Sequence, residues 1–431
     1  MPLIVDLHLH SHYSRATSKD MDLAHIYAWS KLKGINVVGT GDFTHPKWLE
    51  EIQQQLEPAE PGLWQLKKEI ASKQNQVMPI SYRDNEHRFI LTAEISTIYS
   101  KDNAVRKLHQ ILVAPDLKTV AKINSQLNQI GNLYADGRPI LGLDSVELLK
   151  IAKEVSDQVL FIPAHIWTPW FAMFGSKSGF DSIKETFGDL AGEIKAVETG
   201  LSSDPFMNWR VSNLDDLTLV SNSDAHSPRT LGREANLIDC KFSYDQILGA
   251  IKTNDKRFMG TIEFYPQEGK YHYDGHRKCG VVFSPKETQK HQGLCPVCKK
   301  PLVLGVDYRV DQLADRPEDY RPKNHKKVEY IIPLPEIIAQ IEGVKGTQTN
   351  KVQEKYQKLL EIFGSEFNIL RELKTEEISQ AGFPLLAKAI DRMRTGKIYI
   401  KPGYDGVFGE IKVFKDKQEI EKFKGQRGLG F

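Results

Sequence analysis

Metal-binding residue types fall at regular places in the first 226 residues of the chain. Nine of them lie at or beside the end of a short apolar run of the kind that forms a β-strand: His8, His10, Asp42, His45, Glu94, His109, His165, Asp224 and His226. Six of the nine are histidines, although the whole chain has only thirteen, so chance placement explains the pattern poorly. Imidazole and carboxylate groups together suit borderline ions such as Zn²⁺, Mn²⁺ or Fe²⁺. The pattern predicts a metal site.

The spacing within this set indicates how many ions it could hold. His8 and His10 are two residues apart, as are Asp224 and His226, and alternate residues of a strand point to the same side. Nine groups exceed the roughly four to six ligands that one ion takes, so we expect two or three ions, with a carboxylate such as Glu94 as a bridge. Such ions lower the pKa of a bound water and stabilise a leaving oxygen, which is the chemistry of phosphoester hydrolysis.

Structural roles compete with metal binding at single positions. Asp42 follows a strand and could be a helix N-cap, and His165 precedes an aromatic loop in which it could simply pack. His12 lies close enough to the others to serve as a reserve ligand. Only the joint pattern favours metal binding over these alternatives.

The elements that must position these side chains alternate between strands and helices up to residue 265. Helices are predicted over 21–34, ending at Gly34, and over 145–155, with Asp144 as N-cap. Repeated strand–helix units predict parallel strands, in a barrel or an open sheet, whose C-terminal ends share one rim. The strands are expected at 3–7, 35–40, 88–95, 109–114, 159–164, 193–198 and 217–222.

A second, smaller metal site is predicted further along the chain. His276-x-x-Cys279 and Cys295-x-x-Cys298 have the two-knuckle spacing of a structural zinc ribbon in which His replaces one Cys. His272 is the competing fourth ligand. A closed set of four ligands leaves no open position, so the zinc would serve to fold this segment, contributing on the order of 10 kcal/mol.

Charge is distributed unevenly between the two parts of the chain. Residues 1–265 carry 28 Lys/Arg against 33 Asp/Glu, whereas residues 266–431 carry 30 against 23. The basic part could contact polyanions, although a solvated surface would explain this modest excess about as well. The candidate contacts with a DNA backbone are Lys299, Lys300 and Arg309, with Arg316 and Arg321 nearby.

The remaining features bound the class of protein. The length of 431 residues suggests two or three structural units. No run approaches the ~20 apolar residues of a membrane span, no leader pattern opens the chain, and the cysteines do not form a disulfide framework, so we expect a cytoplasmic protein without membrane contact.

After residue 328 we expect helices over 352–364 and 383–396, then a hairpin over 398–414. The Gly-x-x-Gly at 343–346 is weak evidence for a phosphate-binding helical hairpin.

The motifs DLHLHSH, VGTGDFTHP, LTAEI, LHQILVAP, PAHIW and SNSDAH resemble, in this order, those of the PHP (polymerase and histidinol phosphatase) phosphoesterases over residues 1–260. The resemblance implies an α/β fold, a distorted (β/α)7 barrel with a bi- or trinuclear centre. Phe43 directly after Asp42 departs from the family's Asp-His. The ligands that motif position implies are His8, His10, Glu94, His109, His165, Asp224 and His226, with Asp42 or His45. The implied catalytic set is His8, His10, Asp42, Glu94, His165, Asp224 and His226.

The order of the parts narrows the resemblance. A PHP barrel (1–265), a zinc-ribbon module (266–327) and a mainly helical, DNA-binding C-terminal region (328–431), with ETGLSSDPFMNWR and KPGYDGVFGEI, are together similar to the endonuclease Q family. That implies a DNA repair endonuclease that hydrolyses the phosphodiester 5′ to a deaminated base, namely uracil, hypoxanthine or xanthine. It further implies two or three divalent ions (Zn, Mn, Mg or Fe) in the barrel, one structural Zn in the ribbon, and DNA and other repair or replication proteins as partners.

A nuclease that senses a damaged base also needs a pocket for it. The loop IWTPWFAMFGSKSGF follows His165, and its Trp167, Trp170 and Phe171 could stack on an extruded base, unless they pack on the barrel instead. Two other functions stay open. The barrel alone would suit a PHP-type small-molecule phosphatase, and a barrel without activity would leave a non-catalytic zinc-ribbon DNA-binding protein.

Overall fold

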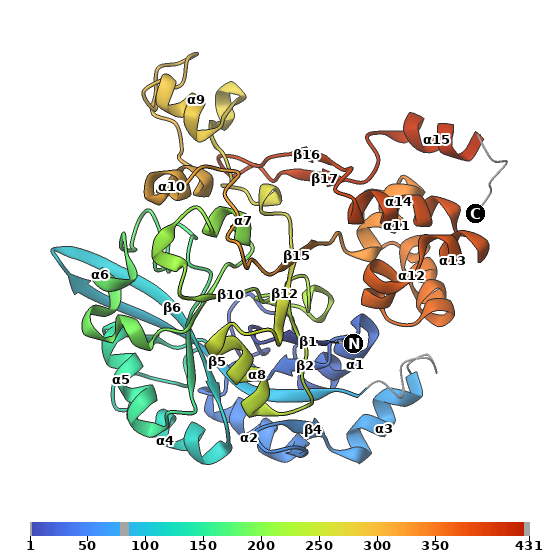
Figure 1. Ribbon diagram of the computed structural model, residues 1–431. Helices are drawn as coiled ribbons and strands as arrows, with labels where there is room; N and C mark the ends of the chain where they lie inside the picture. Colours follow the sequence, from blue (N-terminus) through green and yellow to red (C-terminus); the bar gives the residue numbers. More distant parts are fainter. Residues whose placement is uncertain (1, 78–85, 426–431) are drawn as a thin grey trace.

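The structure, a computed structural model, describes residues 2–77 and 86–425. Residue 1 and residues 426–431, which fall in the first and third predicted units, lie outside the described residues. The chain runs from a large α/β part, called the barrel below after the predicted fold, through a small ribbon to a helical region (Figure 1). The mixed α/β class is as predicted. Among the described residues, no helix qualifies as a candidate membrane span.

All seven strands predicted from the sequence are present. β1 pairs with β2 and β2 with β5 in parallel, and β9 pairs with β10 in parallel. An isolated parallel bridge between Leu9 and Ala225 joins the chain after β10 to the chain after β1. No ladder joins β8 to β9 within the described part of the chain, although the two lie side by side. The strands are β1 (Leu3–Asp6), β2 (Val37–Gly39), β5 (Arg88–Lys101), β6 (Ala104–Ala114), β8 (Leu160–Pro163), β9 (Ala196–Glu198) and β10 (Thr218–Val220).

β6 departs from the parallel pairing that the repeated strand–helix units predicted. This strand runs antiparallel to both β5 and β8. Asp102 and Asn103, which connect β5 to β6, have φ of 52° and 58°, and two left-handed residues make the tight turn that suits a hairpin. The dipeptide Asp-Asn between two apolar runs was the sequence signal for it.

Side chains of these strands alternate between two separate apolar cores. Val5, Ile90 and Ile162 pack with α8 (Tyr244–Thr253) in one core. Their neighbours Ile4 and Leu91 pack in the other core, beneath the outer helices. Burial on both faces is what places strands between an interior and a surrounding layer of helices. The outer helices include α1 (Leu23–Lys33), α2 (Pro46–Gln55), α3 (Lys68–Val77), α4 (Leu117–Leu127), α5 (Ser145–Val155), α6 (Ile183–Phe187) and α7 (Pro205–Asn208).

Both predicted helix caps are present, since Gly34 ends α1 with φ 89° and Asp144 accepts from the Val146 amide at the start of α5.

Further strands extend the sheet. β15 pairs in parallel with β12, so the predicted boundary at 327/328 falls within a strand of the barrel's sheet. The added strands are β3 (Leu56–Pro58), β4 (Trp64–Leu66), β7 (Ile140–Leu141), β11 (Ala235–Ile238), β12 (Phe258–Glu263) and β15 (Lys327–Tyr330).

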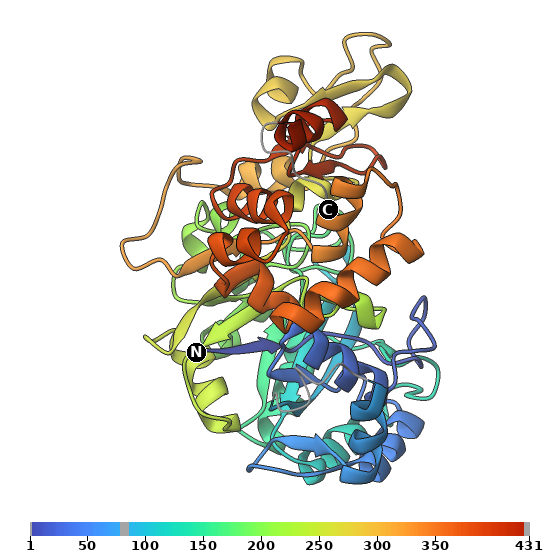
Figure 2. The ribbon, with the colours of Figure 1, turned by 90° about the vertical axis from the view of Figure 1, so that its right-hand side faces the viewer.

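The ribbon and the helical region lie on the same side of the barrel (Figures 1 and 2). The ribbon contains β13 (Asp274–His276), β14 (Val281–Phe283), α9 (Pro285–Lys290) and α10 (Val306–Leu313). The helical region contains α11 (Leu334–Glu342), α12 (Asn350–Phe363), α13 (Thr375–Gln380), α14 (Pro384–Arg394) and α15 (Lys417–Gly425), with the predicted hairpin β16 (Tyr399–Lys401) and β17 (Glu410–Lys412). The hairpin reaches the ribbon through a bridge between Tyr273 and Tyr404. The Gly-x-x-Gly lies between α11 and α12.

Candidate metal centre

Three overlapping groups of side chains meet at the ends of the barrel strands. Within each group the ligand atoms lie within 4.8 Å of one another. The groups are His8, His10 and Glu94; His10, Asp224 and His226; and Glu94, His109 and His165. Because His10 and Glu94 each belong to two groups, the seven side chains form one continuous cluster. They are the seven ligands that motif position implied.

Glu94 lies at the centre of this cluster. Its Oε1 is 2.7 Å from His109 Nδ1 and 3.1 Å from His165 Nε2. Its Oε2 is 3.2 Å from His10 Nε2 and 3.0 Å from Arg138 Nη1. The two oxygens therefore face different ligand groups, as a carboxylate that bridges two ions must.

The backbone is strained where three of the strand-end residues turn inward. Asp42, His165 and Asp224 have φ of 47°, 28° and 45°, a left-handed region that costs a non-glycine residue on the order of 1–3 kcal/mol. Local hydrogen bonds hold two of them, since the His165 amide donates to Glu198 Oε2 at 2.8 Å and Arg233 donates to the Asp224 carbonyl at 3.3 Å. Strain retained at several residues of one site is typical of functional geometry.

Orphaned polar atoms test whether the cluster fits a metal ion. His8 Nε2, His10 Nε2 and Asp224 Oδ1 are buried without a hydrogen-bond partner. The Asp224 oxygen is 3.6 Å from the first nitrogen and 3.2 Å from the second. Leaving a polar group buried and unpaired costs about 1–3 kcal/mol, and a divalent ion between these atoms would satisfy all three. The residues fit the expected metal.

The electrostatics of the cluster are those of a site prepared for cations. Burial opposes the charged imidazoles of His8 and His10, but facing carboxylates raise the pKa of both well above the ordinary value. Burial likewise opposes ionisation of Glu94, but His109, Arg138 and His8 hold its pKa well below the usual range. Burial lowers the pKa of His109 to about 4. Metal binding would displace protons here, so affinity should fall at low pH.

Asp42 and His45, which the sequence predicted to bind metal, lie outside all three ligand groups. Asp42 lies behind His10, with Oδ1 3.1 Å from His10 Nδ1, and its Oδ2 accepts from the Ser11 amide at 2.6 Å. A carboxylate in this position orients a ligand imidazole. His45 caps α2, where its Nδ1 accepts from the Trp48 amide at 3.4 Å.

Two residues that sequence reasoning missed also contact the cluster. Glu198 at the end of β9 is fully buried and 3.0 Å from His8 Nδ1. Arg138 contacts Glu94 and keeps 26% of its side chain exposed. The preceding residue is Gly137, where a Cβ would lie 2.2 Å from Asp42 Oδ2, so a larger residue there would displace Asp42. Glu198 ends a predicted strand, so the placement of ligands at strand ends could have identified it. Arg138 lies in a loop, where no sequence pattern indicates a role.

The aromatic loop after His165 divides into core and surface residues. Trp167 is only 1% exposed and donates from Nε1 to Asn208 Oδ1 at 2.8 Å, so it packs in the core, the alternative that the sequence left open. Trp170 is 53% exposed. The Phe171 ring lies 4.6 Å from the His109 ring, and Lys107 lies over both Trp170 and Phe171. Of the three aromatic residues predicted to contact a base, Trp170 and Phe171 are therefore the two that could still do so.

The ribbon brings its four predicted ligands together. The ligand atoms of His276, Cys279, Cys295 and Cys298 lie within 4.8 Å of one another. His272 is buried apart from them, with its ring stacked on Tyr273, so His276 is the fourth member. Although burial opposes it, backbone amides of Cys298 and Val297 lower the pKa of the Cys295 thiol to about 6. Thiolate character of this kind suits zinc.

The basic residues near the ribbon differ in whether their side chains are exposed or already paired. Lys299 and Lys300 are exposed at the second knuckle. Arg309 instead donates to the Phe174 and Phe180 carbonyls at 3.0 and 3.1 Å and pairs with Asp181. This guanidinium, which the sequence predicted to contact DNA, attaches the ribbon to the barrel. Arg316 pairs with Asp215, and Arg321 lies over the Phe206 ring.

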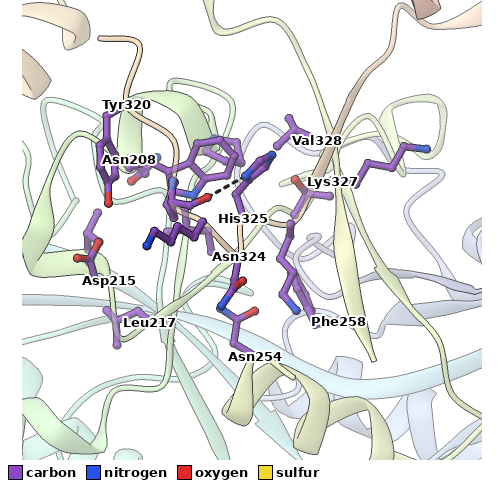
Figure 3. A pocket seen from close by; sticks show the side chains of 18 residues that line it. Asn208, Asp215, Leu217, Asn254, Phe258, Tyr320, Asn324, His325, Lys327 and Val328 are labelled. Atoms are coloured by element: carbon purple, nitrogen blue, oxygen red, sulfur yellow. Dashed lines mark hydrogen bonds between the residues drawn. The ribbon is translucent and has the colours of Figure 1, made fainter. Parts of the chain in front are cut away.

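A cavity of about 250 Å³ lies elsewhere, between the barrel and the segment that leads into β15 (Figure 3). Asn208, Trp209 and Phe258 line it from the barrel side, and Asn324 and His325 from the other. None of the seven clustered ligands is among its lining residues. This cavity therefore lies apart from the cluster of candidate ligands.

Two comparisons of sequence match parts of the chain. The family model of the MJ0043 C-terminal domain matches residues 333–397. Protein MJ0043 of Methanocaldococcus jannaschii is 34% identical over 261 residues, which are 59% of this chain and 32% of that protein. This chain thus spans about a third of that relative's length.

Two solved structures are similar to nearly the full chain. The lesion-specific endonuclease PfuEndoQ from Pyrococcus furiosus has a TM-score of 0.83 at 32% identity, covering 98% of this chain and 97% of that one. Endonuclease Q in complex with a 27-mer duplex substrate with an abasic lesion at the active site has a TM-score of 0.80 at 32% identity, covering 96% and 97%.

Proposed function

This chain belongs to the endonuclease Q family, and we propose that it is a metal-dependent DNA repair endonuclease that cuts 5′ to a deaminated base. The observation that carries the proposal is the extent of the likeness to a lesion-specific endonuclease, which includes barrel, ribbon and helical region alike. A barrel alone would leave the substrate open, because one fold hosts many functions. Uracil, hypoxanthine and xanthine are the proposed bases.

The barrel cluster would hold two or three divalent ions, Zn, Mn, Mg or Fe. Its nitrogen and oxygen donors suit Zn²⁺, Mn²⁺ or Fe²⁺ best. The ions, when bound, would supply Lewis-acid activation of a water nucleophile and of the phosphate. The residues proposed to bind them are His8, His10, Glu94, His109, His165, Asp224 and His226. The ribbon ligands would hold one structural Zn.

The side chains around the cluster would support this chemistry in distinct ways. Asp42 fixes the ring of His10 through a 3.1 Å contact with Nδ1. Arg138, partly exposed beside Glu94, has further N–H groups that could donate to a phosphate oxygen, which is the geometry in which Arg recognises phosphate. Burial of the ligands excludes bulk water and strengthens these interactions.

DNA would contact the protein at two further places. Exposed Trp170, with Phe171 behind it, offers an aromatic surface near His109 on which a base could stack. Lys299 and Lys300 at the exposed knuckle would contact phosphates.

The test is an incision assay with a metal count on the same preparation. Labelled oligonucleotides carrying uracil, hypoxanthine, xanthine or no lesion are incubated with Mn²⁺ or Mg²⁺, before and after treatment with EDTA. We expect a cut on the 5′ side of the deaminated base and little on the undamaged strand.

His8→Ala and Asp224→Asn are the matched inactive variants, and both should retain the ribbon zinc. Failure to cut any damaged strand, together with turnover of histidinol phosphate, would replace the proposal with a small-molecule phosphatase. DNA binding that is unchanged in both variants, without metal in the barrel or incision by the wild type, would indicate a non-catalytic DNA-binding protein.

A further inference from the structure

Glu198 lies behind the metal cluster and contacts two of its ligands at once. Its Oε2 is 3.0 Å from His8 Nδ1 and accepts from the His165 backbone amide at 2.8 Å. Its Oε1 is 3.1 Å from His8 Nδ1 and accepts from Asn222 Nδ2 at 2.8 Å. These two ligands are 157 positions apart in the sequence and meet at this one carboxylate.

The two ligands belong to different halves of the cluster. His8 groups with His10, whereas His165 groups with His109. Glu94 contacts both halves from the front, and Glu198 contacts both from behind. The rings of His8 and His165 lie stacked with centroids 6.0 Å apart. We propose that Glu198 is a positioning residue that couples the two halves of the centre, an inference that rests on the metal-dependent function proposed above.

The chemistry at Glu198 requires a group that only accepts hydrogen bonds. The Asn222 amide nitrogen and the His165 backbone N–H are both donors, and a carboxylate oxygen accepts from each. His8 completes the set if its Nδ1 carries the proton, which leaves Nε2 free to bind an ion. Glutamine has nearly the same shape, but its NH₂ group would face one of these donors.

The bond to His165 has a particular consequence for the second half. His165 has φ 28°, so its backbone needs an external contact to hold this conformation. Asp42 differs from Glu198 in this respect. It contacts the ring of His10 and the loop of Ser11 and Ser14, but not His8 or His165. Glu198 therefore controls the orientation of the His8 ring in one half of the cluster and the backbone conformation of His165 in the other.

The experiment compares Glu198→Gln and Glu198→Asp with the wild type and with Glu234→Gln. Glu234 is the matched control because it is also completely buried, and burial together with the nearby Glu263 and Glu198 carboxylates raises its pKa. Cobalt is titrated into metal-depleted protein while ion number, affinity and the visible spectrum are recorded. A cobalt–thiolate band reports the ribbon alone, since the barrel cluster has no cysteine.

For Glu198→Gln we expect the affinity of the barrel for cobalt to fall by about 10–100-fold, with weaker binding in both halves of the cluster. The barrel spectrum should change, and the ribbon band should not. Glu234→Gln should match the wild type. If Glu198→Gln does not fold, Glu198→Asp carries the test, since its shorter carboxylate cannot keep both contacts and should weaken binding.

Two results would overturn the inference, and they have different meanings. Wild-type affinity and spectrum in the folded Gln variant, or in the Asp variant if the Gln variant does not fold, would contradict the role of Glu198 while leaving the proposed function intact. A wild-type protein that binds no ion in the barrel would remove the proposed function and this inference together.

Discussion

The barrel and the ribbon build metal sites by opposite means. The barrel cluster collects ligands from His8 to His226, and two apolar cores pack around the strands that carry them. The ribbon ligands lie between His276 and Cys298, next to a core of Val281, Cys295 and Leu302. The barrel fold can therefore hold its site before metal arrives, whereas the ribbon needs metal to fold. The difference predicts which changes damage function alone and which damage structure.

The largest effect is expected when the ribbon loses its metal. Cys295→Ser should remove one zinc and with it folding free energy on the order of 10 kcal/mol for this segment. Hydrogen exchange should become fast over 271–305 while the barrel strands stay protected. Cys240→Ser is the control, because Cys240 lies outside the group. A ribbon that stays protected in Cys295→Ser would show that packing on the barrel is enough.

The barrel should respond in the opposite way. Glu94→Gln removes the charge between the two ligand groups and should lower single-turnover incision on the order of 10³-fold, about 4 kcal/mol of barrier, without unfolding the protein. Glu193→Gln, at an exposed ion pair with Lys153, should leave incision unchanged. Loss of fold in Glu94→Gln would mean that the barrel also depends on its ions.

Substitutions in the loop after His165 should separate its buried residue Trp167 from its exposed residue Trp170. Trp167→Ala should lower the free energy of unfolding by about 3–5 kcal/mol, because it empties a buried site. Trp170→Ala should change it by less than about 0.5 kcal/mol and weaken only binding of damaged DNA. Chemical denaturation and DNA binding measure the two effects, and equal destabilisation would contradict the division of this loop.

The contact between the two regions should have a smaller effect. Arg309→Ala removes bonds to the Phe174 and Phe180 carbonyls and should cost about 1–3 kcal/mol. Exchange should rise in both 174–181 and 306–313, with both metal sites still loaded. Lys286→Ala, at an exposed pair with Glu318, is the control. Unchanged exchange would mean that the ribbon is attached elsewhere.

The smallest effect concerns the ribbon surface. Lys299→Ala with Lys300→Ala should weaken DNA binding a few-fold and reduce the salt dependence of affinity by up to about two counterions. Incision at saturating enzyme should be unchanged. An equal loss with Lys184→Ala, an exposed barrel lysine, would indicate general charge and not a specific contact.

The sequence predicted the ligands because strand ends and alternate spacing are local properties. His8, His10 and Asp224 could be assigned from them, as could the ribbon set. The role of Asp42 could not be predicted, because φ 47° turns its carboxylate behind His10 and not beside it. The sequence likewise did not indicate whether Trp167 was core or pocket, since that depends on Asn208, 41 positions away.

Long-range pairing explains the other differences. The β5–β6 hairpin depended on a two-residue turn, Asp102 and Asn103, between two predicted strands. Arg309 appeared free because Phe174 and Asp181 lie more than a hundred positions earlier. Local patterns describe what a residue can do, and the fold decides which partner it meets.

Anomalous diffraction from crystals grown with Mn²⁺ or Zn²⁺ would show directly whether the barrel cluster binds metal. We expect at least two peaks in the barrel, on both sides of Glu94 and within bonding distance of the seven ligands, with the ribbon peak as an internal standard. A ribbon peak accompanied by a barrel without any would contradict it.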